Sequence, residues 1–298
     1  MDPYTKNYIL FWVCVIGLCL GSFYNVVILR SLSGESLVFP SSKCPKCGNK
    51  LKPWHNIPVL SYIFLRGKCA FCKDKISIQY PLIELLTMGL FAFSFLKFGI
   101  SWQTLFSMTI CSALIIMSMT DIKEKLVDCN IAIGLAVVAI LYNWLVGSAI
   151  VDSLIGLVAG VVIMELIARI GYLFSKGRAF GEADTYVAGA LGACFGLMGL
   201  LQILIYTLFV AAIVIIPKFL HQQYKNNHKS VCVLFILFIL SALVFKTFIQ
   251  NWISLGFLLI LGLALVFVIL KNLRTEQSPV YFPLVPAFSI ATLYFLFF

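Results

Sequence analysis

Stretches of about twenty consecutive apolar residues recur along this chain of 298 residues, and each is long enough to cross a bilayer as an α-helix. Hydrophobic residues make up 61% of the chain and charged residues only 11%, which excludes an ordinary soluble domain. The sequence therefore predicts an all-α polytopic membrane protein. We expect about ten transmembrane helices, at residues 8–29, 80–98, 102–120, 130–147, 150–173, 185–197, 199–217, 231–249, 252–270 and 281–298. The sixth and seventh of these are counted separately because Gly196 and Gly199 interrupt the apolar run there.

Lysine and arginine are distributed unevenly between the connecting loops. Of the 22 such residues, all except Lys6, Lys97 and Lys246 fall in alternate loops. Because cytoplasmic loops carry the excess of positive charge, we expect these loops to be cytoplasmic and both termini to face outward. The same bias accounts for the net charge of +10, so we expect a lipid bilayer and no nucleic acid as partners. The positive loops are 30–79, 121–129, 169–184, 218–229 and 271–280.

Segment 30–79 carries two Cys-x-x-Cys pairs, Cys44 with Cys47 and Cys69 with Cys72. Each pair can aim two sulfur atoms at one point, so together they have the ligands of a tetrahedral zinc site. A cytoplasmic location is reducing, which argues against two disulfides. Four thiolates leave no open coordination position, so we expect the zinc to be structural and to compensate for the small core of this module.

Three other residues of this module bear on the zinc prediction. Gly48 and Lys73 each follow the second cysteine of a pair, where a metal-binding knuckle needs a tight turn. His55 lies between the pairs and is a possible further ligand or base. We favour a solvated loop histidine, because four thiolates already satisfy a zinc ion.

Two aspartates stand where apolar runs meet positive loops: Asp121 follows the run 102–120, and Asp184 precedes the run 185–197. Two carboxylates brought together share one proton, so one can activate water while the other protonates or polarises an amide. That is the chemistry of an aspartic peptidase. An ion or proton pathway that also uses Glu165 explains the same spacing equally well, although an ion pair between Glu165 and Arg169 accounts for that glutamate without one.

The aspartates belong to a series of motifs that occur in a set order along the chain. In this order, the motifs resemble those of the bacterial type IV prepilin peptidases, and the resemblance covers nearly the whole chain. The motifs are Gly21–Arg30, the paired cysteines, Asn56-Ile57-Pro58 with Ser61, Tyr80–Glu84, Asp121 with Asp128, Gly181–Asp184 and Pro283–Phe288.

The resemblance implies a membrane aspartyl peptidase in which Asp121 and Asp184 are catalytic. It implies cleavage of the short basic leader of type IV prepilins or pseudopilins at the cytoplasmic face of the bacterial inner membrane. Many members of that family also N-methylate the new terminus, with S-adenosylmethionine as the methyl donor. Three departures from the family pattern, Val127, Ala183 and Tyr186, keep a catalytically inactive assembly protein open as an alternative.

The resemblance also suggests how the chain is divided. Residues 1–29 form the first transmembrane helix, 30–79 the cytoplasmic zinc module and 80–298 the transmembrane peptidase core. The family plan has about eight transmembrane helices, so we interpret 231–270 as a two-helix insertion.

Acidic side chains cluster around the two aspartates in sequence. Glu124, Asp128 and Glu182 lie in the same two short segments, and we expect them to bind the basic leader of a substrate. The alternative for the two glutamates is that they are solvated loop charges, since Lys123 and Lys125 flank Glu124.

Asn25 and Glu84, two polar residues of the first two spans, each have a structural and a functional interpretation. Gly17 and Gly21 share one face of the first span and predict close helix packing there. Asn25 is one turn further on, and it either completes that seam or faces the substrate. Glu84 lies near the positive end of the second span, where the helix dipole favours it, although it could also face the site.

Overall fold

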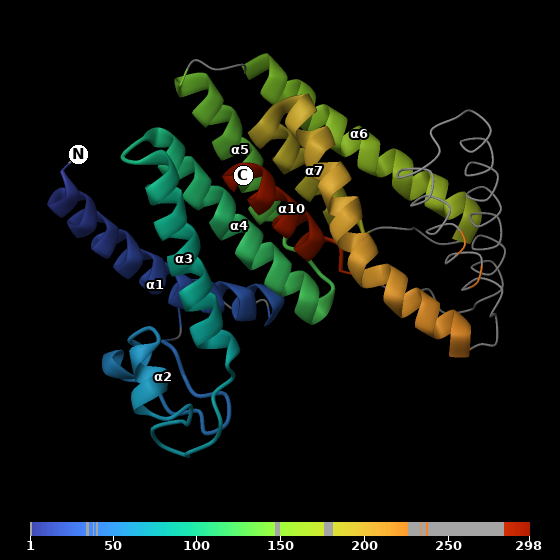
Figure 1. The fold of residues 1–298 in the computed structure, drawn as a ribbon. Coiled ribbons are helices and arrows are strands. Elements are labelled where there is room, and N and C mark those ends of the chain that lie inside the picture. The colour runs from blue at the N-terminus through green and yellow to red at the C-terminus, as the bar shows by residue number, and fades with distance from the viewer. Residues whose placement is uncertain are drawn as a thin grey trace. The chain divides into compact units, whose positions relative to one another are not determined.

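The computed structural model describes residues 2–33, 41–146, 150–175, 181–225 and 283–298, together with 36, 37, 39, 233 and 237. The expected spans 231–249 and 252–270 fall outside this part of the chain apart from 233 and 237. The described elements confirm the all-α class (Figure 1). They are α1 (Pro3–Ser33), η1 (Pro53–Asn56), α2 (Leu60–Phe64), α3 (Gln79–Phe98), α4 (Trp102–Glu124), α5 (Cys129–Leu145), α6 (Ile150–Ser175), α7 (Glu182–Lys225) and α10 (Val285–Phe297).

Five helices in the described residues are long and apolar enough to cross a membrane, and α5 and α10 are shorter apolar helices. The full count of ten spans therefore stays a prediction. Within α7 the helix breaks at Gly196, whose φ of 68° and ψ of −176° are not helical. The interruption that the sequence predicted at this glycine is thus present. The five membrane-length segments are Pro3–Ser31, Gln79–Phe98, Trp102–Glu124, Ile150–Arg169 and Glu182–Ala211.

The chain divides into two compact units. The first comprises Met1–Val162, Glu182–Leu204 and Pro283–Phe298, so it contains both aspartates and the two cysteine pairs. The second comprises Ile163–Gly181 and Ile205–Phe282. In the second unit the expected ion pair is present, with Arg169 Nε 3.1 Å from Glu165 Oε1.

Helix α1 packs against α3 along a seam of small residues. A Cβ atom added at Gly21 would lie 2.7 Å from Glu84 Cα, and one added at Gly17 would lie 2.8 Å from Met88 Cα. Real Cβ atoms do not approach other atoms so closely, so only glycine permits this backbone separation. The close packing that the spacing of these glycines predicted is confirmed.

Replacing Gly21 with alanine is expected to destabilise the first unit by about 1–3 kcal/mol, because the new methyl group overpacks the α1–α3 seam. The matched control is Gly89→Ala in α3, where an added Cβ meets nothing within 4 Å. Thermal unfolding of both variants in detergent checks the difference. Equal melting temperatures for the two variants would contradict the role of this seam.

Helix α4 is the most buried membrane-length helix of the described chain, and α10 packs along it (Figure 1). The hydroxyls of Ser118 and Ser289 lie 2.6 Å apart across this contact. Farther along α10, Phe295 packs edge-on against Phe195 of α7, with ring centroids 5.3 Å apart. Helix α10 therefore contacts both helices that carry the aspartates.

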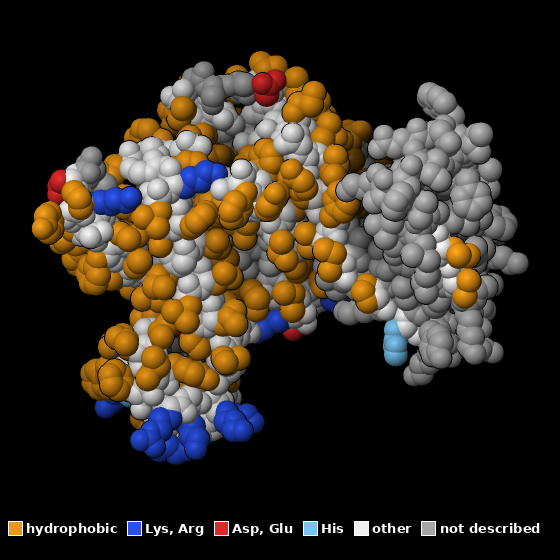
Figure 2. All heavy atoms as spheres, viewed as in Figure 1, with side chains coloured by type: hydrophobic (Ala, Val, Ile, Leu, Met, Phe, Trp, Pro, Cys, Tyr) orange, Lys and Arg blue, Asp and Glu red, His pale blue; other side chains and the backbone are white. Residues whose placement is uncertain are grey.

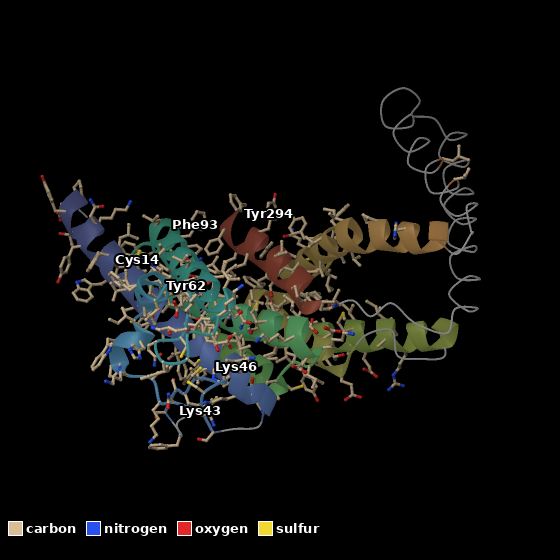
Figure 3. The ribbon with its side chains drawn as sticks, turned by 90° about the horizontal axis from the view of Figure 1, so that it is seen from below. Cys14, Lys43, Lys46, Tyr62, Phe93 and Tyr294 are labelled. Atoms are coloured by element: carbon tan, nitrogen blue, oxygen red, sulfur yellow. The ribbon has the colours of Figure 1, made fainter. Side chains whose placement is uncertain are left out.

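The segment 30–79 with its two cysteine pairs, called the cysteine module from here on, lies beyond one end of α1 and α3 (Figure 1). Apolar side chains cover the helices on the face shown in Figure 2, whereas Lys and Arg side chains gather at the far end of the module. A perpendicular view shows Lys43 and Lys46 on the module and Phe93 and Tyr294 on the helices (Figure 3). Phe93 packs edge-on against Phe297, which joins α3 to α10. The module also exposes apolar side chains, among them Ile63 and Phe64, so on this face its positive charge is confined to its far end.

Candidate functional site

The four expected metal ligands come together. The sulfur atoms of Cys44, Cys47, Cys69 and Cys72 all lie within 4.8 Å of one another, and those of Cys44 and Cys72 are 4.0 Å apart. A tetrahedral zinc with Zn–S bonds of about 2.3 Å needs sulfur atoms about 3.8 Å apart, so this cluster fits the ion. The backbone N–H groups of Cys72 and Phe71 lower the pKa of Cys69 to about 7, whereas the pKa of Cys72 beside it is raised to about 11.

The two cysteine turns have the same local geometry. In the first, the Gly48 N–H donates to the Cys44 carbonyl at 2.9 Å; in the second, the Lys73 N–H donates to the Cys69 carbonyl at 3.1 Å. Gly48 and Lys73 both have left-handed backbones, with φ of 70° and 61°. The tight turns that the sequence predicted at these positions are therefore present. Local turn geometry directs each pair of sulfurs toward the common centre.

Asp121 is buried in the last turn of α4, with 2% of its surface exposed. The helix ends just beyond it, where Lys125 adopts a left-handed conformation and its N–H donates to the Asp121 carbonyl at 3.0 Å. The Asp121 carboxylate accepts a 3.1 Å hydrogen bond from the backbone N–H of Val285, the first residue of α10. The sequence analysis singled out the motif Pro283–Phe288, which contains Val285, but it did not predict this contact with Asp121.

Asp184 is buried in the first turn of α7, with 6% of its surface exposed. It belongs to the same compact unit as Asp121. Each aspartate therefore lies at the end of an apolar helix and is largely withdrawn from solvent.

The loop after Asp121 approaches the start of α7. Asp128 caps α5 by accepting a 2.9 Å hydrogen bond from the Asn130 N–H. Asp128 and Glu182 both lie close enough to Cys129 for their charges to act on its thiol. Asp128 and Glu182, two of the four residues expected to bind a substrate, thus both lie near Cys129. The side chains of Glu182 and Glu124 are exposed.

Asn25 lies in the α1–α3 seam rather than with these acidic residues. It is 1% exposed, and its Nδ2 donates to the carbonyls of Tyr80 and Gly21, each at 3.2 Å. The Gln79 side chain donates to Asn25 Oδ1 at 3.5 Å. The hydrogen bonds to Tyr80 and Gln79 therefore join α1 to α3, as the structural interpretation of this residue expects, while the bond to Gly21 lies within α1.

Glu84 connects three parts of the first unit. Its Oε2 accepts a 2.7 Å hydrogen bond from the Val59 N–H in the cysteine module, and its carboxylate is also hydrogen-bonded to Ser22 of α1. Val59 has a φ of 60°, an unfavourable conformation for a β-branched residue. The helix dipole alone did not predict these contacts, which make Glu84 a bridge between the module and the helices.

Two families match successive parts of the chain. Residues 15–98 match the family described as "Bacterial Peptidase A24 N-terminal domain". Residues 108–216 match the "Type IV leader peptidase family". The first match includes the cysteine module and the α1–α3 seam, and the second includes both aspartates.

Several curated proteins named "Prepilin leader peptidase/N-methyltransferase" are similar to this chain. The protein from Myxococcus xanthus is 33% identical over 67% of this chain, which spans 60% of that relative's length, less than two thirds of it. The protein from Neisseria gonorrhoeae is 35% identical over 62% of this chain and 74% of its own length. The protein from Bacillus subtilis is 32% identical, with coverages of 67% and 79%. No solved structure matches the chain.

Proposed function

Because this chain belongs to the type IV leader peptidase family, we propose that it is an aspartyl peptidase of the bacterial inner membrane. Its substrates are type IV prepilins or pseudopilins, from which it removes the short basic leader. The observation that best supports this proposal is the burial of Asp121 and Asp184 at helix ends within one compact unit. Co-expression with a prepilin, followed by mass spectrometry of the pilin N-terminus, tests it.

The proposed mechanism uses the two carboxylates as one acid–base pair. They share a proton, so the ionised member removes a proton from water while the protonated member donates to the scissile amide. The hydrogen bond from Val285 fixes the orientation of the Asp121 carboxylate. The four cysteines would hold a structural zinc, whose closed coordination shell leaves it no part in the cleavage.

The proposed reaction takes place at the cytoplasmic face of the membrane. Asp121 and Asp184 adjoin loops 121–129 and 169–184, which belong to the positively charged set. In the same topology, the cysteine module of 30–79 is cytoplasmic and 80–298 forms the transmembrane core. The basic leader of a prepilin then reaches the aspartates without crossing the bilayer.

The names of the relatives add a second proposed activity. They are called N-methyltransferases as well as peptidases, so we propose that this chain also methylates the amine that cleavage exposes. The methyl donor would be S-adenosylmethionine. Methylation needs a site for this donor in addition to the pair of aspartates.

Acidic side chains near the aspartates are proposed to attract the leader. Asp128 and Glu182 lie close to Cys129, and Glu182 and Glu124 are exposed to solvent. Negative charge beside the aspartates complements the Lys and Arg of a leader on an otherwise positive face. Asn25 remains a weaker substrate-binding proposal, because its hydrogen bonds are made within the α1–α3 seam.

The double variant Glu124→Gln with Glu182→Gln is expected to raise the apparent KM for a prepilin several-fold at low salt, with kcat little changed. The increase should shrink as salt rises, because exposed charges are screened over about 8–10 Å at physiological ionic strength. Asp152→Asn, at an exposed position of α6, is the matched control. An unchanged KM across the salt series would show that these glutamates do not attract the leader.

A further inference from the structure

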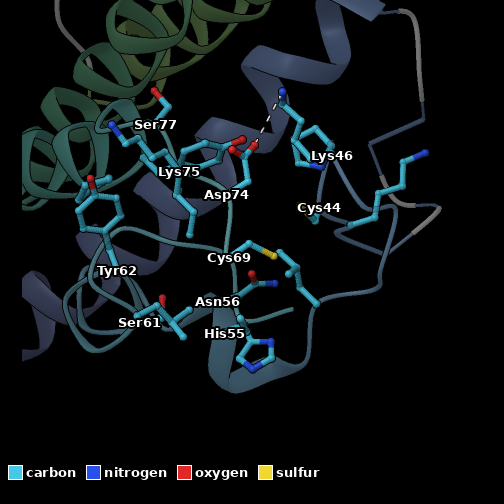
Figure 4. A pocket seen from close by; sticks show the side chains of 18 of the residues that line it. Cys44, Lys46, His55, Asn56, Ser61, Tyr62, Cys69, Asp74, Lys75 and Ser77 are labelled. Atoms are coloured by element: carbon cyan, nitrogen blue, oxygen red, sulfur yellow. Dashed lines mark ion pairs between the residues drawn. The ribbon is translucent and has the colours of Figure 1, made fainter. Parts of the chain in front are cut away.

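Helix α2 of the cysteine module has two unlike faces. Ser61 and Tyr62, with Leu65 just after the helix, line a cavity of about 310 Å³ between the module, α1 and α3 (Figure 4). The residues at the i, i+3 and i+4 positions of α2 do not line this cavity, and their side chains share one exposed face. With exposed fractions of 53%, 62% and 81%, they are Leu60, Ile63 and Phe64. The exposed face of α2 is therefore the more apolar one.

The exposed apolar surface continues before the helix. Ile57, three residues before α2 begins, is also exposed. Figure 2 shows apolar side chains on the flank of the module where Figure 1 places α2, away from the far end where Lys and Arg gather. An exposed group of large apolar side chains marks a surface that binds a partner or a membrane. The apolar face of α2 is defined here as Ile57, Leu60, Ile63 and Phe64.

The start of α2 is fixed to a helix of membrane length. The N–H of Val59, the residue before α2, donates to Glu84 Oε2 at 2.7 Å, and Glu84 also lines the cavity. Glu84 lies in the second turn of α3, about 7 Å along the helix axis from its first residue. At the same level α3 exposes Leu82 and Leu85, which a membrane-spanning helix presents to lipid. Helix α2 is thus held at the level where the bilayer begins.

Positively charged residues flank the apolar face of α2 in the chain. Segment 52–68 contains Lys52, Arg66 and Lys68 but no Asp or Glu. All three are exposed, and none forms an ion pair in the described part of the chain. The Lys52 ammonium lies 5.2 Å from the ring centroid of Trp54, which is itself exposed. Anionic phospholipids attract Lys and Arg, and Trp is enriched at membrane interfaces, so this surface complements a lipid headgroup layer.

We propose that the apolar face of α2 inserts into the cytoplasmic leaflet of the membrane, while Lys52, Arg66 and Lys68 contact anionic phospholipid headgroups. The proposal rests on the membrane topology proposed above and is independent of the peptidase activity. Transfer of the apolar side chains from water to the acyl boundary is the driving force. Because the chain attaches the module to α1 and α3, the effective concentration of lipid at α2 is high, and a weak contact is enough to orient the module.

A second copy of the chain or a soluble protein is the other occupant to weigh. Two copies of this surface carry the same positive charges and repel each other. A soluble partner would have to replace lipid at the level of Leu82 and Leu85, where lipid is already present. The position of α2 and its charges therefore favour the bilayer.

An environment-sensitive fluorescent amino acid in place of Phe64 measures insertion directly. The full zinc-loaded chain is placed in nanodiscs that hold one chain each and contain anionic phospholipids with brominated acyl chains. Bromine quenches only at short range, so this fluorophore should be quenched several-fold more than the same fluorophore in place of Asn49, an exposed residue of the first cysteine turn. Equal quenching at the two positions, or none at position 64, would overturn the proposal.

Amide hydrogen exchange across residues 57–68 identifies the side chains that make the contact. These amides should exchange several-fold more slowly in anionic nanodiscs than in zwitterionic ones. The double variant Ile63→Gln with Phe64→Gln should lose the protection in both lipids. The matched control is Phe39→Gln, which alters another exposed phenylalanine of the module and should keep the protection. Wild-type protection in the double variant would contradict insertion.

A charge variant separates the two parts of the proposed contact. Arg66→Gln with Lys68→Gln should remove the difference between anionic and zwitterionic lipid while quenching at position 64 persists. Because the altered side chains are exposed, zinc content and melting temperature in detergent should match the wild type. Protection in single-chain nanodiscs without quenching at position 64 would show that another segment of the chain covers α2, and would overturn the proposal. No prepilin is present, so a chain that cleaves leaders but shows no quenching would refute the membrane contact alone.

Discussion

Replacing Asp121 or Asp184 with asparagine is expected to lower leader cleavage by about 10²- to 10⁴-fold, the usual contribution of general acid–base catalysis. Either change removes one of the two carboxylates that share a proton, so neither single variant retains the pair. Asparagine preserves the size of the side chain, and at position 121 it keeps an oxygen that can accept the Val285 N–H. The loss should therefore be one of chemistry and not of folding.

The measurement is the fraction of co-expressed prepilin processed by each variant at matched amounts of protein in the membrane. Asp152→Asn is the control, because Asp152 is an exposed residue of α6 and is not part of the proposed site. The empty vector gives the background level of processing. If Asp121→Asn or Asp184→Asn processed as much prepilin as Asp152→Asn does, the catalytic assignment would be rejected. It would also revive the alternative in which the aspartates serve a proton pathway.

Replacing Cys44 or Cys72 with serine is expected to release zinc and unfold the cysteine module. Structural zinc sites contribute about 10–16 kcal/mol of apparent binding free energy, and in a small module that energy is folding energy. The module's described secondary structure consists of η1, α2 and two isolated bridges, so it has little other regular structure to hold it. The transmembrane helices should outlast it, because their packing does not involve the metal.

Metal analysis of the purified chain checks this prediction, with limited proteolysis of residues 30–79 as the structural readout. Wild type and Cys19→Ser, whose cysteine is an exposed residue of α1, should each hold about one zinc per chain. The Cys44 and Cys72 variants should hold far less and be cut rapidly within the module. A wild-type chain without zinc, or variants as resistant to protease as wild type, would contradict the structural role of the metal.

Features that depend on neighbouring residues in the chain were predictable from the sequence. The apolar runs 80–98 and 102–120 correspond to α3 and α4, because a helix that crosses a membrane needs a long run of apolar residues, which the sequence shows directly. The cysteine cluster followed from two pairs with local turns at Gly48 and Lys73. Helix α1 extends beyond the predicted 8–29, since backbone hydrogen bonds continue past the apolar part of a helix.

Tertiary structure decided the contacts that join distant parts of the chain. The Val285 N–H reaches Asp121 across 164 positions, and no local pattern identifies which backbone group will meet a given carboxylate. The same holds for Glu84, whose contacts with Ser22 and Val59 and whose place in a cavity wall depend on how α1, α3 and the module pack. Residue type and spacing determined which chemistry was available, because they record helix length, charge and local turns. Packing determined which groups meet, because a buried carboxylate takes its partners from whichever segments the fold brings beside it.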